Sequence, residues 1–346
     1  MREHKEFQVL PPLAKGTLIK EKQYRIMSDV VSQGGFGRIY MVTSVTQNSR
    51  EKKKYALKEF YPRQVKKTMS GIMSMGNYTK VETEGVIREL KARFYQEAKL
   101  LSIIGGHRYG RKKNVPTIYG VPFEEGERTF YLMEYIEGPT LTKEVENWES
   151  MPEDTAVVII TKIAKVLNKA HKQGLIHGDI SPNNIILRDG TPVLVDFGNA
   201  MSYNNDLVLS RIETENLSPS QIFEHALDKV TTHEKNLFDE PEVHIDNIGT
   251  PGFCAPRELA GKPACDAFSL AATFYFLLTG EKPRLISSEK DKVEMMEILK
   301  QHNISRVSKD TIVRVLSMED LGDRPIREFL YGISHRVIDT ILHAED

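Results

Sequence analysis

Two short stretches in the second half of the chain carry side chains suited to acid–base chemistry and to metal binding. The first, HGDISPNN at 177–184, holds the carboxylate of Asp179 and, five positions later, the carboxamide of Asn184. The second begins with Asp196 in the sequence DFG, seventeen positions after Asp179. A carboxylate can act as a base beside a hydroxyl group, and carboxylate and carboxamide oxygens suit Mg²⁺. Because turns also use Asp and Asn freely, the interpretation depends on these residues meeting.

The segment between the two stretches gives them a reason to meet. Apolar runs at 185–187 and 193–195 flank Asp189-Gly190, a dipeptide typical of two-residue hairpin turns. A hairpin at this position returns Asp196 to the end at which its first strand begins. The sequence therefore predicts that a base and two oxygen ligands for a metal lie at one place.

A glycine-rich run, SQGGFG at 32–37, lies between the strand-like segments Val30-Val31 and 39–42. Gly34 and Gly37 carry no side chain, so backbone amides in such a turn can approach phosphate oxygens closely. A glycine turn between strands is more often structural than functional. The interpretation as a phosphate site therefore needs support from other residues.

Lys58 and Glu97 give that support. Lys58 lies in a strand predicted at 55–60, on the same face as Ala56, because side chains alternate along a strand. Glu97 lies in a helix predicted at 86–104, on its apolar face together with Leu90, Phe94 and Leu101. A carboxylate on a buried face needs a partner, and Lys58 is the natural candidate. The alternatives are an exposed lysine and a glutamate that reaches water.

The remaining pattern predicts strands first and helices later. Further strands are expected at 118–121 and 129–133, and the pattern becomes mostly helical after Glu137-Gly138. Ser150 followed by Glu153 forms a capping box for a helix that ends before Gly174. Its apolar stripe contains Ala156, Ile159, Ile160, Ile163, Leu167 and Ala170. The other helices are predicted at 266–279, 220–230 and, as one or two closing helices, 323–343.

Taken together, these motifs resemble those of the eukaryotic-like (Hanks-type) serine/threonine protein kinases. The resemblance covers about Tyr24 to Leu330 and runs through the glycine run, YALKEF, the Glu97 helix, LMEYIEG, HGDISPNN, VDFG, GTPGFCAP, DAFSLAATFYFLLTG and DRP. The KEFYP ending of the Lys58 strand is similar to many bacterial members. The resemblance implies an α+β, two-lobed kinase-like fold, with a small antiparallel sheet lobe carrying one main helix and a larger, mostly helical lobe.

The resemblance also implies a role for each site residue, with ATP as phosphate donor and Mg²⁺ as metal. Asp179 would be the catalytic base, and the Lys58–Glu97 pair would hold the inner phosphates. Asn184 and Asp196 would bind the metal. The rest of the nucleotide site would comprise Ser32, Gly34 and Gly37 in the loop, Ile39 and Ala56 over the adenine, and Met133, Glu134 and Ile136 along its edge. Thr250 would lie beside Asp179, and His177 would be structural.

Four positions depart from the family pattern, one of which is Arg257, where the family has a glutamate that usually pairs with an arginine equivalent to Arg324. Ser32 replaces the first glycine of the loop, and Gly178 replaces the arginine that usually pairs with a phosphorylated activation loop. Ser181 replaces a lysine that neutralises the transferring phosphate, so phosphoryl transfer should be slower unless another cation compensates. The activation segment 196–258 is long, and we expect 199–248 to be a regulatory insert.

Three functions are therefore compared. The first is an ATP-dependent kinase that phosphorylates Ser or Thr of proteins, itself included. The second is a small-molecule kinase of the aminoglycoside or choline type, because HGD without the following lysine is similar to those enzymes; GTPGFCAP and the helix at Asp266 favour a protein substrate instead. The third is a pseudokinase scaffold that binds nucleotide without transferring phosphate.

Composition limits the partners. The chain of 346 residues has 47 basic and 48 acidic residues, which gives no reason to expect nucleic acid as a ligand. Two cysteines and no apolar signal core near Met1 favour the cytoplasm, and the most apolar run, 267–278, is shorter than the ~20 residues of a membrane span. The expected domains are an extension at 1–23, an N-lobe at 24–136 with an insertion at 64–85, and a C-lobe at 137–346. The substrate protein and the oligomeric state are not predicted.

Overall fold

The computed structural model describes residues 10–33, 37–45, 53–61, 80–105, 114–202, 250–319, 321–322 and 324–333. These residues fall into two compact units. The first unit holds the described residues within 1–103 and 116–135, and the second holds those within 104–115, 136–210 and 229–346. The possible helix at 220–230 and most of the expected regulatory insert lie outside the described residues.

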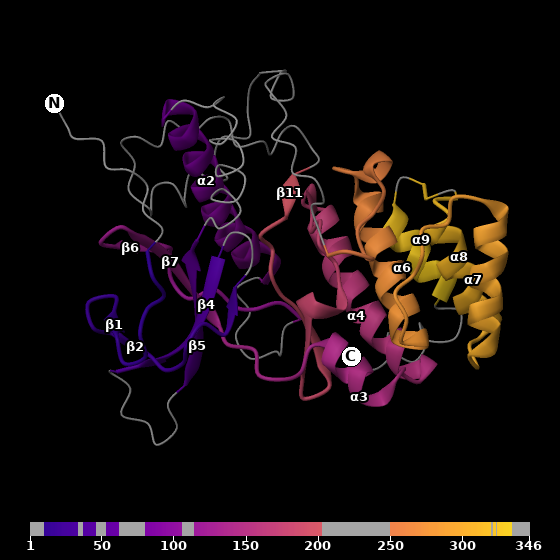
Figure 1. Cartoon of the computed structure of the whole chain (residues 1–346), viewed down its shortest axis with the longest axis horizontal. Helices are drawn as coiled ribbons and strands as arrows, with labels where there is room; N and C mark the ends of the chain where they lie inside the picture. The colour runs from indigo at the N-terminus through magenta and orange to yellow at the C-terminus, as the bar shows by residue number, and fades with distance from the viewer. Residues whose placement is uncertain are drawn as a thin grey trace. The chain divides into compact units, whose positions relative to one another are not determined.

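The first unit is built on one antiparallel sheet with a long helix (Figure 1). The sheet order is β1-β2-β4-β5-β7-β6, and β3 pairs with β4. The elements are β1 Leu18–Ile19, β2 Tyr24–Ile26, β3 Ser32–Gln33, β4 Gly37–Ser44, β5 Lys54–Phe60, α2 Lys80–Gly105, β6 Phe123–Glu125 and β7 Arg128–Glu134. The predicted strands at 39–42, 55–60 and 129–133 and the helix at 86–104 are confirmed.

The two faces of this sheet carry different side chains. One face is covered by a buried cluster of Ile19, Ile26, Tyr40, Val42, Tyr55, Leu57, Phe130 and Leu132. Because partners across antiparallel strands share a face, Ile39, Lys58 and Tyr131 form a row on the opposite face. The ring of Phe94 from α2 contacts that of Tyr131 at 4.9 Å between centroids. Helix α2 therefore packs on the face that carries Lys58.

Two predicted strands of the first unit are wrong in detail, and the helix is longer than predicted. Val30 and Val31 are not strand residues; β3 begins at Ser32, although the amide of Val31 still donates to the Ile39 carbonyl at 2.7 Å. At 118–121, only Ile118 forms a bridge, to Met133 of β7; the regular strand is β6 at 123–125, which pairs with residues 128–130 of β7. Helix α2 begins at Lys80, so the last six residues of the expected insertion at 64–85 are helical.

The second unit is mostly helical, with small two-stranded sheets (Figure 1). Its elements are α3 Leu141–Trp148, α4 Glu153–His171, β8 Leu175–Ile176, the 3-10 helix η1 Pro182–Asn184, β9 Ile185–Arg188, β10 Thr191–Leu194, β11 Met201–Ser202, η4 Arg257–Leu259, α6 Pro263–Thr279, α7 Glu289–Gln301, α8 Arg306–Leu316 and α9 Pro325–Ile333. Helices α4, α6, α8 and α9 pack on one another. Helix α6 is buried on nearly all sides, as its continuous apolar sequence predicts.

The stripe predicted for α4 is confirmed, because all six of its apolar residues are buried. The capping box before it is wrong: the N-cap is Pro152, and no side chain caps this end. Glu153 is the first residue of the helix, and its carboxylate accepts hydrogen bonds from the amide and the hydroxyl of Ser305, at the start of α8. Of the closing helices predicted at 323–343, α9 lies at 325–333, and residues from 334 on lie outside the described residues.

The hairpin between the two motifs forms as predicted. Strands β9 and β10 pair antiparallel with Thr191 opposite Arg188. Asp189 and Gly190 both have positive φ, 47° and 74°, as a two-residue turn that follows the twist of the strands requires. The amide of Val195 donates to the carbonyl of Asn184 at 2.8 Å, so Asp196 follows directly on a residue bonded to Asn184.

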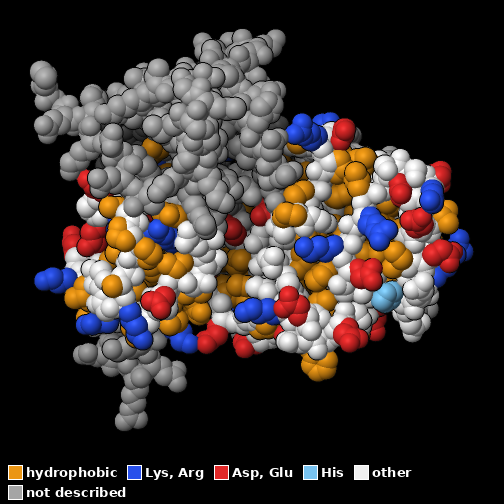
Figure 2. Space-filling view, in the orientation of Figure 1, with side chains coloured by type: hydrophobic (Ala, Val, Ile, Leu, Met, Phe, Trp, Pro, Cys, Tyr) orange, Lys and Arg blue, Asp and Glu red, His pale blue; other side chains and the backbone are white. Residues whose placement is uncertain are grey.

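The second unit presents a mixed surface. On the face that Figure 2 shows, the acidic and basic side chains of its described residues are interspersed and form no large patch of one sign. This agrees with the near balance of charges in the sequence.

Candidate active site

In the first unit, the predicted ion pair is present. Nζ of Lys58 on β5 lies 2.6 Å from Oε1 of Glu97 on α2. Only 7% of the Lys58 side chain and 4% of the Glu97 side chain are exposed. A buried carboxylate and a buried ammonium each need the other's charge, so this pair fixes the lysine on its face of the sheet.

The glycine at the start of β4 leaves room for this lysine. Gly37 is opposite Phe60 in the sheet, and a Cβ on Gly37 would lie 2.8 Å from Cε of Lys58. Any larger residue would therefore displace the Lys58 side chain. Gly34 lies outside the described residues. Ser32 lies in β3, where it pairs with Ile39, so this departure from the family pattern is in a strand rather than in the turn.

The residues expected around adenine lie in the two units. In the first, Ala56 is opposite both Met41 and Met133 in the sheet, and Ala56 and Met133 are buried. The amide of Glu134 donates to the Thr117 carbonyl at 2.8 Å, so a backbone hydrogen bond between Glu134 and a ligand would have the Glu134 carbonyl as acceptor. Ile136 is buried in the second unit.

In the second unit, the carboxylate of Asp179 accepts hydrogen bonds on both oxygens. The amide and the hydroxyl of Thr250 each donate to Oδ1 at 2.8 Å. Nδ2 of Asn184 donates to Oδ2 at 3.1 Å and to the Asp179 carbonyl at 2.9 Å. A weaker contact of 3.5 Å comes from Nδ2 of Asn199. These donors hold Asp179 in one orientation.

Ser181 supports the same carboxylate through Thr250. The Ser181 side chain is fully buried, and its Oγ lies 3.1 Å from Oγ1 of Thr250. Because the single hydroxyl proton of Thr250 goes to Asp179, Ser181 is the donor in this bond. Ser181 therefore orients the group that holds Asp179 and does not supply the positive charge of the lysine that it replaces.

Asn184 and Asp196 fit an oxygen-liganded metal. Since Nδ2 of Asn184 faces Asp179, its amide oxygen would be the atom available to a metal. Asp196 is exposed and has φ of 61°, a conformation uncommon for residues other than glycine and held here by its surroundings. No group of three or more His, Cys, Asp or Glu side chains within the described ranges could hold a metal. Two protein oxygens completed by phosphate oxygens are the donor set that Mg²⁺ commonly takes.

Asp266 is a residue of the site that sequence reasoning missed. It is fully buried in the first turn of α6, and its carboxylate accepts from the amides of His177 and Gly178 at 2.8 and 2.9 Å. Nε2 of His171 lies 2.9 Å from it. Burial by itself raises the pKa of Asp266, but the His171 hydrogen bond and the neighbouring amide lower it below its ordinary value. A charge at the start of an otherwise apolar helix was the available signal.

His177 and Phe197 join the two motifs. The His177 ring is fully buried, and its centroid is 4.5 Å from that of Phe197 in an edge-on contact. Nδ1 of His177 accepts from the amide of Asp179 at 3.3 Å. Burial lowers the pKa of His177, so the ring is neutral at neutral pH.

The backbone conformation at position 178 explains why a glycine replaces the arginine of the family pattern there. Its φ is 77°, and a Cβ at this position would lie 2.8 Å from the carbonyl oxygen of Asn199. An arginine here would meet that carbonyl in a strained conformation. The segment after Asp196 therefore packs directly on the backbone ahead of Asp179.

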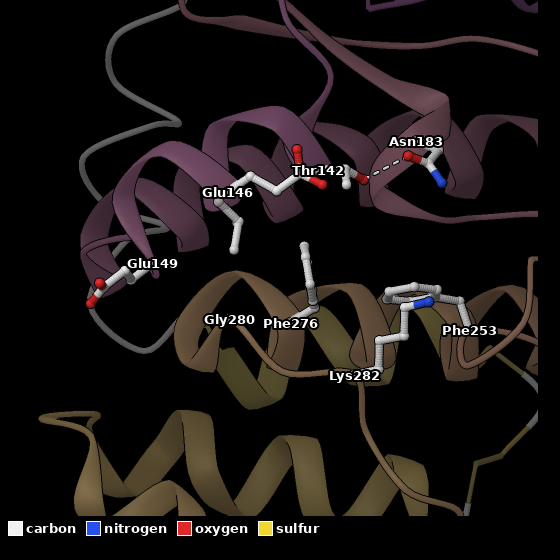
Figure 3. A pocket seen from close by; sticks show the side chains of 9 residues that line it. Thr142, Glu146, Glu149, Asn183, Phe253, Phe276, Gly280 and Lys282 are labelled. Carbon is white, nitrogen blue, oxygen red and sulfur yellow. Dashed lines mark hydrogen bonds between the residues drawn. The ribbon is translucent and has the colours of Figure 1, made fainter.

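A cavity of about 460 Å³ opens beside these motifs in the second unit (Figure 3). Its lining includes Asn183, next to Asn184, and Phe253, three residues after Thr250. Oγ1 of Thr142 on α3 donates to Oδ1 of Asn183 at 2.7 Å, which ties the helix to the motif. Glu146 of α3 and Lys282 also line the cavity.

Comparison with known sequences identifies the family. The model of the protein kinase domain matches residues 26–333. The chain belongs to the protein kinase family. The α+β kinase-like fold expected from the motifs is thereby confirmed.

The chain is similar in sequence to several serine/threonine-protein kinases. Serine/threonine-protein kinase C of Synechocystis sp. is 28% identical over 278 residues, 79% of this chain and 42% of that protein. Serine/threonine-protein kinase PknA of Nostoc sp. is 29% identical over 211 residues, 60% of this chain and 32% of that protein. The serine/threonine-protein kinase YPK3 of Saccharomyces cerevisiae is 26% identical over 288 residues, 79% of this chain and 47% of that protein. The chain spans less than half the length of each of these kinases.

Two further observations concern membrane-spanning helices and cysteines. Among the residues placed in the structure, no helix is long and apolar enough to cross a membrane. Cys254 and Cys265 are both free thiols. Cys254 donates from Sγ to the Thr250 carbonyl at 3.0 Å, beside Asp179.

Proposed function

We propose that this chain is a serine/threonine protein kinase that transfers the γ-phosphate of ATP to protein hydroxyl groups with Mg²⁺. The observation that carries the proposal is the Asp179 carboxylate, which Thr250 and Asn184 hold on both oxygens. A carboxylate fixed in this way can accept the proton of an incoming hydroxyl and orient its oxygen for attack.

The other predicted site residues would have separate roles in phosphoryl transfer. Lys58, held by Glu97, would bind the inner phosphates of ATP, while Ala56 and Met133 would contact adenine. Asn184 and Asp196 would hold Mg²⁺ by side-chain oxygens, and the ion would neutralise charge on the phosphates. Such catalysis depends on positioning and charge, and little covalent chemistry is asked of the protein.

A protein substrate is supported by the cavity beside Asn183 and Phe253. A polypeptide whose hydroxyl group reaches Asp179 could place a neighbouring side chain there, whereas a small acceptor would not need this space. The relatives are named serine/threonine-protein kinases, and they do not favour the small-molecule kinase or the pseudokinase. The cytoplasmic location stays a prediction.

The test is transfer of radiolabelled phosphate from [γ-³²P]ATP with Mg²⁺ to the chain itself and to generic protein acceptors. Asp179→Asn removes the charge of the proposed base and should lower transfer at least ~100-fold, in the range that general acid–base groups contribute. Asp189→Asn is the matched control, because this residue lies in the exposed hairpin turn and asparagine accepts its positive φ. Equal activity in the two variants would refute the assignment of Asp179.

A panel of aminoglycosides and choline tests the substrate class in the same assay. We expect label in protein and none in these small acceptors. Label in a small acceptor but not in protein would replace the proposal with the small-molecule kinase. Absence of transfer to any acceptor by the unaltered chain would contradict the kinase activity itself.

A further inference from the structure

A buried cluster of charges lies on the face of the first unit's sheet opposite Lys58. Arg38 of β4, Glu59 of β5 and Arg128 of β7 form this arginine–glutamate cluster across three adjacent strands. Arg38 and Glu59 are 4% and 2% exposed, and Nη1 of Arg38 lies 3.6 Å from Oε2 of Glu59. Arg128 pairs with Oε1 of the same carboxylate. The guanidinium of Arg38 also stacks on the ring of Tyr61, 3.4 Å from its centroid.

The cluster has more hydrogen-bond donors than its carboxylate can satisfy. Each guanidinium carries five N–H groups, and one carboxylate must serve both. The chain ahead of the sheet supplies two further acceptors, although Nε of Arg38 is buried with no hydrogen-bond partner among the described residues. The carbonyl of Leu10 accepts from Nη1 of Arg38 at 2.9 Å, and the carbonyl of Pro11 accepts from Nη2 of Arg128 at 2.6 Å. Residues 10–13, Leu-Pro-Pro-Leu, are called the N-terminal strap below.

The composition of the strap suits this task. Pro11 and Pro12 have no amide N–H, so this part of the backbone offers acceptors without donors that would oppose the guanidinium groups. The first amide after the prolines, that of Leu13, donates to the hydroxyl of Tyr40 at 3.1 Å. That hydroxyl in turn donates to Oε2 of Glu59 at 2.8 Å, and Tyr40 is fully buried. Leu13 packs against the apolar cluster on this face.

The strap is thereby connected to the proposed ATP-binding lysine. Glu59 and Lys58 are neighbours on β5, with their side chains on opposite faces of the sheet. Arg38 is the cross-strand partner of Glu59, and it follows Gly37, which leaves space for the Lys58 side chain. Glu97 fixes Lys58 from one face while the cluster fixes the adjacent backbone from the other.

We propose that the N-terminal strap and the arginine–glutamate cluster position Lys58. Residues 10–13, which precede the matched kinase domain, would thus contribute to the ATP site. This rests on the proposed function for the role of Lys58, whereas the docking of the strap does not. Arg38, Glu59, Arg128 and Tyr40 are positioning residues that act through the backbone of β5.

The test uses the full chain with Tyr40→Phe, which removes only the hydroxyl that joins Leu13 to Glu59. Tyr24→Phe is the matched control, because this tyrosine lies in the same sheet and takes no part in the cluster. Amide hydrogen exchange should be about tenfold faster at Leu13 in Tyr40→Phe than in the unaltered chain, and unchanged in Tyr24→Phe. Unchanged exchange at Leu13 in Tyr40→Phe would show that the strap is not held as proposed.

The effect on Lys58 is read from the ATP dependence of transfer. Tyr40→Phe should raise KM for ATP severalfold, whereas a merely structural loss lowers the folded fraction, and with it kcat, without changing KM. Faster exchange at Leu13 with an unchanged KM would overturn the positioning role. If the unaltered chain transfers no phosphate, the proposed function fails, and calorimetric titration with ATP and Mg²⁺ then replaces KM in the same comparison.

Arg128 provides a second test should Tyr40→Phe fail to fold, because its side chain is 15% exposed at the rim of the cluster. Arg128→Lys keeps the positive charge and a hydrogen-bond-donating group, whereas Arg128→Met keeps only the apolar stem of the side chain. Exchange at Leu13 and KM for ATP should both rise in Arg128→Met and be partly restored in Arg128→Lys. Equal values in the two variants would contradict the proposal.

Discussion

Replacing Glu97 by glutamine tests the ion pair with Lys58 through two separate quantities, stability and activity. Glu97→Gln keeps the shape of the side chain and an oxygen acceptor but removes the negative charge. The Lys58 ammonium would then remain buried, with 7% of its side chain exposed, beside a neutral partner. Removing one member of a buried pair costs about 3–5 kcal/mol, and we expect the lower end because glutamine still accepts a hydrogen bond. The free energy of unfolding of the first unit should therefore fall by about 3 kcal/mol.

The double variant Lys58→Met/Glu97→Leu separates the two quantities. Apolar residues of similar volume often replace a buried ion pair at little or no cost, so this variant should be more stable than Glu97→Gln. Both variants should lose phosphate transfer, because neither presents a fixed ammonium to ATP. Stability would therefore recover while activity would not.

Urea unfolding followed by circular dichroism measures the stability, and transfer from [γ-³²P]ATP measures the activity. Glu294→Gln is the matched control: its partner Lys290 lies 3.8 Å away on the surface of α7, with 85% of the lysine side chain exposed. Exposed pairs contribute ~0–1 kcal/mol, so this control should change neither quantity appreciably. A Glu97→Gln protein as stable as Glu294→Gln, or a double variant that transfers phosphate, would refute the reasoning.

Three further predictions concern the second unit. Thr250→Val keeps the amide donor to Asp179 but loses the hydroxyl donor, which should lower kcat about tenfold and leave KM for ATP unchanged. Thr250→Ser should keep wild-type rates, and steady-state kinetics tests both expectations. Gly178→Ala should lower the free energy of unfolding, measured by thermal unfolding, by about 2 kcal/mol more than Gly190→Ala does. Both glycines have positive φ, but only Gly178 faces a carbonyl within 4 Å. Equal losses in the two variants would contradict this. Burial lowers the pKa of His177, so as pH falls below about 6.5 the unfolded chain binds a proton on this residue before the folded chain does. The free energy of unfolding then falls by up to ~1.4 kcal/mol per pH unit. In urea unfolding, the loss of stability between pH 7 and pH 5 should be smaller in His177→Leu than in the unaltered chain.

Much of the site could be predicted because its residues sit in strongly patterned segments. The period of α2 placed Glu97 on a buried face, and a buried carboxylate requires a partner, which pointed to Lys58. The Asp189-Gly190 turn set the register of β9 and β10 and so the return of Asp196. In both cases a local rule determined a contact between residues distant in the sequence.

The misses have a common physical cause, which is that tertiary partners replaced local ones. Ser150 and Glu153 fit a capping box, but Glu153 instead caps the start of α8 through Ser305. The segment around Ile118 does lie along the end of β7, since the amide of Tyr119 donates to the Leu132 carbonyl at 2.9 Å, but only Ile118 forms a bridge, and the regular strand β6 pairs with the start of β7. The strap offered only a proline pair in sequence, and its role depends on buried arginines from two other strands.

The proposed function requires that ATP binding depend on both Lys58 and Asp196. Calorimetric titration with ATP in the presence and absence of Mg²⁺ tests it most directly, with the unaltered chain, Lys58→Met and Asp196→Asn compared. We expect Mg²⁺ to strengthen ATP binding by the unaltered chain, Lys58→Met to weaken binding under both conditions, and Asp196→Asn to abolish the benefit of Mg²⁺. Wild-type affinity and wild-type Mg²⁺ dependence in both variants would contradict the account.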